Sequence, residues 1–155
     1  MQRTLVVGLG SHHGDDQVGW RVAERLAELG AADCQVKLGR TPSELLAWLH
    51  EGVGDRLVLC DACNGAGAPG SVHRWRWPSD VLALETCRSS HDLSLTEVLA
   101  LAARLNRLPK YVWIWGVELA AAVPACDSLS PAVAAAAALA VERIRAQLTE
   151  EPADA

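Results

Sequence analysis

Three residues of metal-ligand type, Asp16, Asp61 and His91, stand in breaks of the chain that are rich in Gly, Ser or Cys. Asp16 and Asp61 each come shortly after an apolar run, 5–7 and 57–59, and His91 precedes an amphipathic segment. The exits of buried strands are where α/β proteins place their chemistry. Two carboxylates and one imidazole make an O,O,N ligand set for a divalent metal. The sequence therefore predicts a metal site, provided that the fold brings these three residues together.

Each of these residues also has a purely structural interpretation. Asp15 and Asp16 could cap the following helix and favour its dipole, with one of the two facing a cleft. Asp61 could be a surface aspartate in a turn, although a carboxylate after a continuously apolar strand is costly to bury without a partner. His91 could be an ordinary surface or core histidine. Beside two carboxylates it would instead be the nitrogen donor, with Asp92 orienting its other ring nitrogen.

Other motifs near these residues give weaker signals. A Gly-x-Gly pair follows the first apolar run, but the third glycine of a dinucleotide fingerprint would fall on His13, and no Walker motif follows. Cys60 and Cys63 form a C-x-x-C pair, without a second pair at zinc-binding spacing. Cys60 is interpreted as a small buried hydrophobe. His12 and His13 could add to the site, but exposed loop histidines are the simpler interpretation.

Alternating strand and helix patterns must position these residues. Apolar or alternating runs predict strands at 3–9, 34–38, 56–60, 71–77 and 111–117. Helical spacing and capping signals predict helices over 18–29, from 42 to about 51, from 95 with Val98, Leu101, Ala102 and Leu105 on its apolar face, and over 131–148. The acidic tail 149–155 is expected to be frayed.

Strands that alternate with helices predict a mostly parallel five-stranded sheet with helices on both faces. In the common doubly wound order that starts second-first-third, the first and third strands are neighbours at the switch point. The loops after these two strands contain Asp16 and Asp61. This order would therefore make the two carboxylates neighbours.

Composition narrows the function classes. A chain of 155 residues fits a single domain, 1–155. The net charge of −5 argues against a nucleic-acid or anionic-membrane surface, and no apolar stretch is long enough to cross a bilayer. Five cysteines and an N-terminus without a signal-peptide core predict reduced thiols and a cytoplasmic location. We expect a monomer that binds neither nucleic acid nor membrane.

Five motifs, in order along the chain, resemble the hydrogenase maturation proteases. These endopeptidases trim the C-terminus of the large subunit of nickel–iron hydrogenases. The resemblance extends from about Leu5 to Leu148. The first motif comprises residues 8–10, 14–16 and Gly19, and the second comprises residues 58–62 and 69–70. The other three motifs are residues 91–95, 116–118 and 129–131.

The resemblance implies a three-layer α/β/α sandwich around a five-stranded, mostly parallel twisted sheet. It implies that Asp16, Asp61 and His91 are the catalytic and metal-binding residues of an aspartic-type endopeptidase. This trio would grip the nickel already inserted into the precursor of the large subunit, so the protease would hold no permanent cofactor. Ser11 stands where the family usually carries Asn.

Several alternatives remain open at this stage. The metal or a carboxylate could polarise the scissile carbonyl or activate water, since no Ser or Cys nucleophile has an obvious partner. A non-enzymatic, metal-sensing accessory protein could bind the same precursor through the same ligands. A phosphate- or nucleotide-binding domain ranks last, because the acidic pair Asp15–Asp16 would repel phosphate at the helix N-terminus.

Overall fold

The computed structural model describes residues 3–30, 33–50, 53–86, 94–120 and 127–150. Its five strands form one sheet, in the order β2-β1-β3-β5-β4. The strands are β1 (Thr4–Leu9), β2 (Cys34–Gly39), β3 (Arg56–Cys63), β4 (Val72–Trp77) and β5 (Tyr111–Glu118). Only the β4–β5 pairing is antiparallel. The predicted sheet and its second-first-third order are therefore confirmed.

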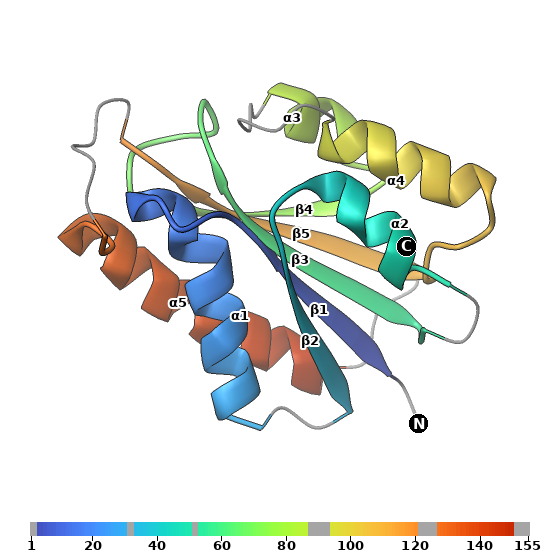
Figure 1. The fold of residues 1–155 in the computed structure, drawn as a ribbon. Coiled ribbons are helices and arrows are strands. Elements are labelled where there is room, and N and C mark those ends of the chain that lie inside the picture. The colour runs from blue at the N-terminus through green and yellow to red at the C-terminus, as the bar shows by residue number, and fades with distance from the viewer. Residues whose placement is uncertain (1–2, 31–32, 51–52, 87–93, 121–126, 151–155) are drawn as a thin grey trace.

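Helices cover both faces of the sheet (Figure 1). They are α1 (Val18–Glu28), α2 (Leu45–Trp48), α3 (Val81–Thr86), α4 (Leu95–Arg104) and α5 (Pro131–Thr149), with 3-10 turns η1 (Gly14–Gln17) and η2 (Pro42–Glu44) before α1 and α2. The helices α1 and α5 lie on one face, and α2, α3 and α4 lie on the other (Figure 1). The expected three-layer sandwich is confirmed.

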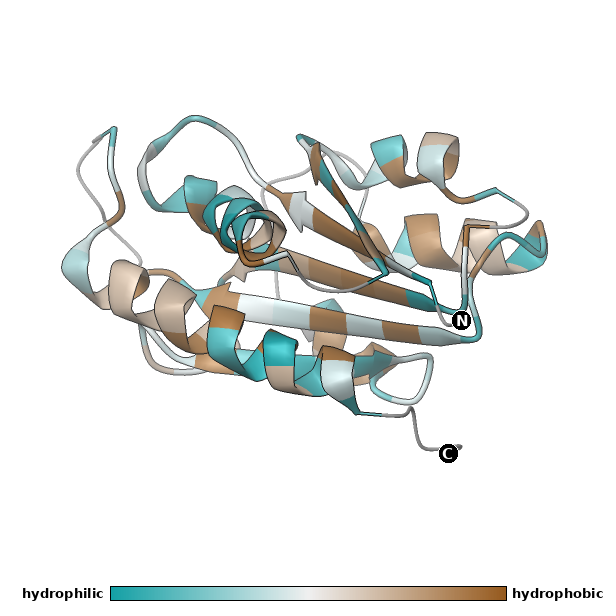
Figure 2. Ribbon diagram, turned by 90° about the horizontal axis from the view of Figure 1, so that it is seen from below, coloured by the Kyte–Doolittle hydropathy of each residue, from teal (hydrophilic) through white to brown (hydrophobic). Residues whose placement is uncertain are grey.

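The central strand β3 shows how the two cores are built. Leu57, Leu59 and Cys63 pack toward α2–α4, while Val58 and Cys60 pack toward α1 and α5. This alternation follows from the two-residue period of a strand. Because both faces are covered, the strand is apolar on both sides, and Figure 2 shows the hydrophobic residues gathered on the sheet and the helix faces that meet it.

Close packing of α1 on the sheet depends on two glycines. A Cβ at Gly19 would overlap the carbonyl oxygens of Leu9 and Cys60, and a Cβ at Gly8 would overlap the Gly19 carbonyl. The first turn of α1 can therefore lie directly on the β1–β3 junction. This close approach brings η1, which carries Asp15 and Asp16, to the carboxyl end of the sheet.

Two boundary predictions were wrong. The third strand was expected to end at residue 60 but continues to Cys63, because β5 pairs with it as far as Cys63 and Glu118. The helix from 42 to about 51 is confined to η2 and α2, and Leu49 has an extended backbone, although the capping box of Thr41 and Glu44 is present. Residues 51–52 lie outside the described part of the chain.

The helix α4 buries a different set of side chains from the predicted one. Val98 and Ala102 are buried as expected, but Leu101 and Leu105 are 44% and 49% exposed. Leu95 and Leu99 complete the buried face instead, so the buried stripe lies three residues earlier than the predicted one. The short helix α3 was not predicted.

At the C-terminus, Thr149 was expected to belong to the frayed tail but is the last residue of α5, and residues 151–155 lie outside the described part. Among the described helices, none combines the length and apolar character needed to cross a membrane.

Candidate active site

Asp16 lies in η1, at the carboxyl end of β1. Its carboxylate accepts a hydrogen bond from the Ser11 hydroxyl, with 2.6 Å between Ser11 Oγ and Asp16 Oδ2. A Cβ at Gly10 would overlap the carbonyl oxygen of Asp16, so the turn fits tightly against the end of the strand. Asp16 is half-buried. The loop therefore fixes the carboxylate with one hydrogen bond and leaves part of its surface open.

Asp15 has a different role from its neighbour. Its two carboxylate oxygens accept hydrogen bonds from the backbone N–H and the hydroxyl of Ser130, at 2.6 Å and 2.8 Å. Ser130 is the N-cap residue of α5. The negative charge of Asp15 therefore faces the N-terminal end of α5, where the helix dipole favours it. The structural interpretation that an aspartate caps the following helix is wrong, because no side chain caps η1 or α1, and Asp15 instead binds the start of a helix distant in sequence.

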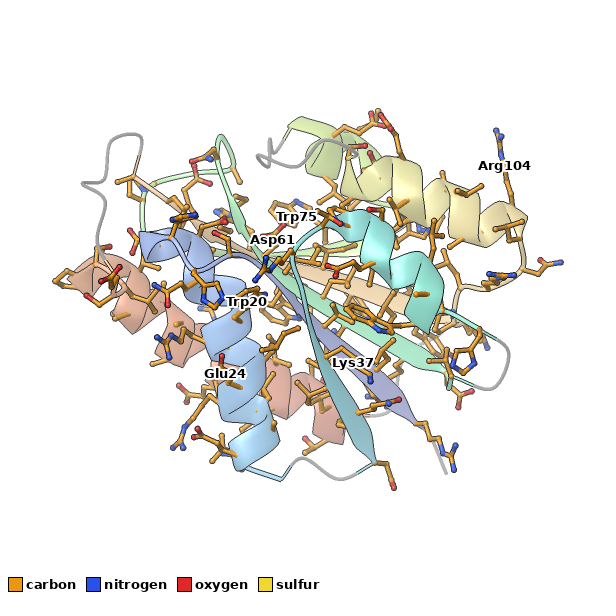
Figure 3. All side chains as sticks on the ribbon, in the orientation of Figure 1. Trp20, Glu24, Lys37, Asp61, Trp75 and Arg104 are labelled. Atoms are coloured by element: carbon orange, nitrogen blue, oxygen red, sulfur yellow. The ribbon has the colours of Figure 1, made fainter. Side chains whose placement is uncertain are left out.

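Asp61 lies within β3 rather than in the loop after it. It alternates in phase with Leu57, Leu59 and Cys63, so its side chain faces the α2–α4 layer. The residue is only 6% exposed, and its Oδ1 accepts a hydrogen bond of 2.8 Å from the N–H of Ala62. In the projection of Figure 3, Asp61 lies between Trp20 of α1 and Trp75 of β4.

The two carboxylates share one region of the fold. Gly8 of β1 pairs with Cys60 of β3, so Asp61 is one residue beyond the last β1–β3 pair. The turn η1 and helix α1 both pack against β3. The structure therefore brings the elements that carry Asp16 and Asp61 together at the carboxyl end of the β1–β3 pair, as the strand order predicted.

His91 lies outside the described residues, and so does Asp92. The described chain resumes at Ser94, whose hydroxyl accepts a hydrogen bond from the N–H of Glu97 and caps α4. Helix α4 leads into the start of β5, so its N-terminus is directed toward the carboxyl edge of the sheet. Within the described ranges, no three His, Cys, Asp or Glu side chains lie close enough to hold a metal ion.

Glu118, at the end of β5, has a structural role beside the loop after β3 that the sequence did not predict. Its buried carboxylate accepts hydrogen bonds from the N–H groups of Gly65 and Ala66 and from the thiol of Cys63. It thereby holds the glycine-rich loop that follows β3. Its position at the end of an apolar strand was the available signal, but its partners lie more than fifty residues earlier in the chain.

Cys60 and Cys63 point to opposite faces of the sheet, since they stand three residues apart on one strand. Three residues of a strand span roughly 10 Å, beyond the reach of a disulfide. Burial, and to a lesser extent the nearby Asp61 carboxylate, raises the pKa of the Cys60 thiol above its ordinary value of 9.0. Neither thiol is part of a disulfide. Cys60 is therefore the buried hydrophobe that the sequence predicted.

Comparison with known proteins identifies the family to which this chain belongs. The model of the hydrogenase maturation protease family, HycI, matches residues 20–147. The chain belongs to the hydrogenase maturation protease family. No curated protein matches the sequence.

Solved structures agree with this assignment. The hydrogenase-maturating endopeptidase HybD from E. coli is 26% identical with a TM-score of 0.79, over 94% of this chain and 91% of that one. The nickel–iron hydrogenase maturation protease HybD from Thermococcus kodakarensis is 27% identical with a TM-score of 0.76, over 95% and 99%. A third structure, an endopeptidase from Escherichia coli, is 27% identical with a TM-score of 0.81, over 94% of this chain and 91% of that one.

Membership of the hydrogenase maturation proteases makes this chain an endopeptidase of hydrogenase maturation. The described part of its site can present two carboxylates at one end of the sheet, one buried and one more open. Such a pair can bind a divalent cation or hold a water molecule for attack on a carbonyl. The assignment of Asp16, Asp61 and His91 to metal binding and catalysis stays a prediction.

Proposed function

We propose that this maturation protease removes a C-terminal extension from the precursor of a nickel–iron hydrogenase large subunit, and that it recognises nickel already inserted into that precursor. The observation that supports the proposal is that η1, which carries Asp16, packs against β3, which carries Asp61, at the carboxyl end of the β1–β3 pair in a chain of this family. Asp16, Asp61 and His91 would bind the nickel of the precursor.

The residue types suit a metal that belongs to the substrate. Two carboxylates and one imidazole leave coordination positions for ligands that the precursor supplies. The rigid placement of Asp61 within β3 and the hydrogen bond from Ser11 to Asp16 would hold these oxygens in place before the precursor arrives. Binding would set the scissile peptide bond beside the carboxylates.

The hydrolysis itself requires an activated water molecule and a polarised carbonyl group. The nickel of the precursor, or one of the two aspartates, would supply these functions. In this arrangement the enzyme acts on a folded client and cuts one bond. We also propose that the enzyme acts as a cytoplasmic monomer without a permanent cofactor.

The proposal is tested by incubating the protein with nickel-loaded and with nickel-free precursor and measuring the intact mass of each. We expect the nickel-loaded precursor to lose a C-terminal fragment and the nickel-free precursor to keep its full mass. Equal cutting of both precursors would refute the recognition of nickel.

The same measurement distinguishes the second candidate function, a metal-sensing accessory protein that binds the precursor without cutting it. A stable complex with the nickel-loaded precursor at unchanged mass would favour that function and refute proteolysis.

A further inference from the structure

His73 and Asp61 lie in one row of the sheet, meaning that both are paired with the same residue of the strand between them. Gly116 of β5 pairs with Asp61 of β3 on one side and with His73 of β4 on the other. Residues paired across a sheet point to the same face. His73 alternates in phase with Trp75, which packs in the α2–α4 core, so it shares the face toward which Asp61 points. Two side chains with polar atoms thus flank a glycine on one face.

The hydrogen bonds of Ser71 determine which ring nitrogen of neutral His73 carries the proton. The Ser71 hydroxyl lies 2.6 Å from the carbonyl oxygen of Ala68, which can only accept, so the hydroxyl donates there. Ser71 Oγ, 2.8 Å from His73 Nε2, must then accept from that nitrogen. The proton of neutral His73 is therefore on Nε2, and Nδ1 is a hydrogen-bond acceptor.

The surroundings of the ring leave Nδ1 available. One face of the ring stacks on Trp75, with centroids 5.7 Å apart, and the Cε1–Nε2 edge lies against Gly67, where a Cβ would stand 3.0 Å from both atoms. Nδ1 has no hydrogen-bond partner within the part of the chain that the structure describes. The ring is thus fixed by Trp75 and Ser71, while one acceptor stays unused.

We infer that His73 is a substrate-binding residue whose Nδ1 accepts a hydrogen bond from a backbone N–H of the precursor segment that runs past Asp61. This inference rests on the proposed function. Two strand spacings separate His73 from Asp61, roughly 9.5 Å, and an extended peptide advances roughly 3.3 Å per residue. His73 therefore meets the precursor about three residues from the bond that is cut.

The chain offers a matched set of variants for testing this role. In His73→Gln, the side-chain amide N–H can still donate to Ser71 in place of Nε2–H, but no acceptor stands where Nδ1 was. In His73→Asn, the side-chain carbonyl oxygen provides an acceptor near the position of Nδ1. Arg74→Gln changes the next residue of β4, which faces the opposite side of the sheet and contacts Trp113. It controls for disturbance of the strand.

We expect His73→Gln to raise the KM for nickel-loaded precursor roughly 3- to 10-fold at unchanged kcat, the effect of one lost hydrogen bond. His73→Asn should stay closer to the wild type, and Arg74→Gln should match it. An unchanged KM in His73→Gln, while the wild type cuts the precursor, would overturn the inference and leave the proposed function intact. Failure of the wild type to cut would refute the proposed function itself.

The backbone contact is tested by replacing the third residue on either side of the cleavage site with proline, which lacks an N–H. At one of these positions proline should weaken cleavage by the wild type and have no added effect in His73→Gln, as expected for two partners of one interaction. Equal effects of proline in both enzymes, at both positions, would contradict the contact.

Long-range proton–nitrogen NMR spectra test the positioning role of Ser71 without any substrate. We expect neutral His73 to carry its proton almost entirely on Nε2 in the wild type, and Ser71→Ala to shift part of the neutral population to the Nδ1–H tautomer. A proton on Nδ1 in the wild type would overturn the assignment of the acceptor.

Discussion

Adjacent residues can carry unrelated tasks, and Asp15 and Asp16 are an example. Asp15 holds Ser130 at the start of α5, whereas Asp16 is held by Ser11 and stays partly open. The sequence allowed one aspartate to cap the following helix while the other faced a cleft, and the family resemblance selected Asp16 as the site residue. The contact of Asp15 with α5 could not be predicted, because Ser130 lies 115 positions away in the chain.

The different contacts of Asp15 and Asp16 predict opposite outcomes for two conservative variants. Asp15→Asn should lower the free energy of unfolding by about 1–2 kcal/mol, because a charged acceptor at the α5 N-terminus is lost. Asp16→Asn should leave stability nearly unchanged and abolish cleavage of the nickel-loaded precursor. Urea unfolding and intact mass measure the two effects. A stable Asp15→Asn protein together with an active Asp16→Asn protein would contradict these roles.

The buried thiol of Cys60 predicts a pH dependence of folding. Its pKa is raised above 9.0 in the folded state, chiefly by burial. Above that pH the unfolded chain loses the proton while the folded chain keeps it, so the free energy of unfolding falls as pH rises. The thiol causes no loss of stability below about pH 9. Above that pH it lowers the free energy of unfolding by up to roughly 1.4 kcal/mol per pH unit.

Cys60→Ala isolates this contribution. Unfolding of both proteins in urea between pH 8 and 10.5 should show a shallower alkaline loss of stability in the variant. Any constant offset reflects the smaller side chain and does not depend on pH. Parallel curves for the two proteins would show that Cys60 does not hold its proton in the folded state.

At the scale of elements, the contact between α1 and the β1–β3 junction positions η1 and therefore Asp16. Gly19→Ala would insert a Cβ into the carbonyl oxygens of Leu9 and Cys60, neither of which can move without shifting a central strand. We expect a loss of about 3 kcal/mol or more in the free energy of unfolding, measured in urea.

Glu24→Ala, on the exposed side of the same helix, is the control and should change stability by less than about 1 kcal/mol. A Gly19→Ala protein as stable as this control would contradict the close packing of α1.

Local patterns predicted which elements exist better than where they end. Apolar runs and capping signals located every strand and the helices α1, α4 and α5, because these features depend on neighbours in sequence. The end of β3 depends on pairing with β5, which no local pattern encodes. For the same reason Asp61 was expected in a loop but lies inside a strand.

The candidate site was predictable in part. Residue type and position after apolar runs selected Asp16 and Asp61, and the strand order brought their elements together. The roles of Glu118 and His73 were not predictable, since each depends on contacts that the fold creates. Glu118 holds a loop from an earlier strand, and His73 joins the row of Asp61 only through Gly116.

At the scale of the whole molecule, the fold serves to gather groups from distant segments at one end of a rigid sheet. The strands carry Asp61 and His73 and η1 carries Asp16, whereas His91 lies outside the described residues. For the proposed function, Asp16, Asp61 and His91 must act as one unit on a single nickel ion held by the precursor.

Cleavage of nickel-loaded precursor by Asp61→Asn, by His91→Gln and by the double variant tests that requirement most directly, with intact mass against time as the readout. Loss of a ligand should cost more than the roughly 10–100-fold typical of residues that support ligands, and the double variant should be no worse than either single one. Independent, multiplying losses, or substantial activity in His91→Gln, would contradict a shared grip on the metal.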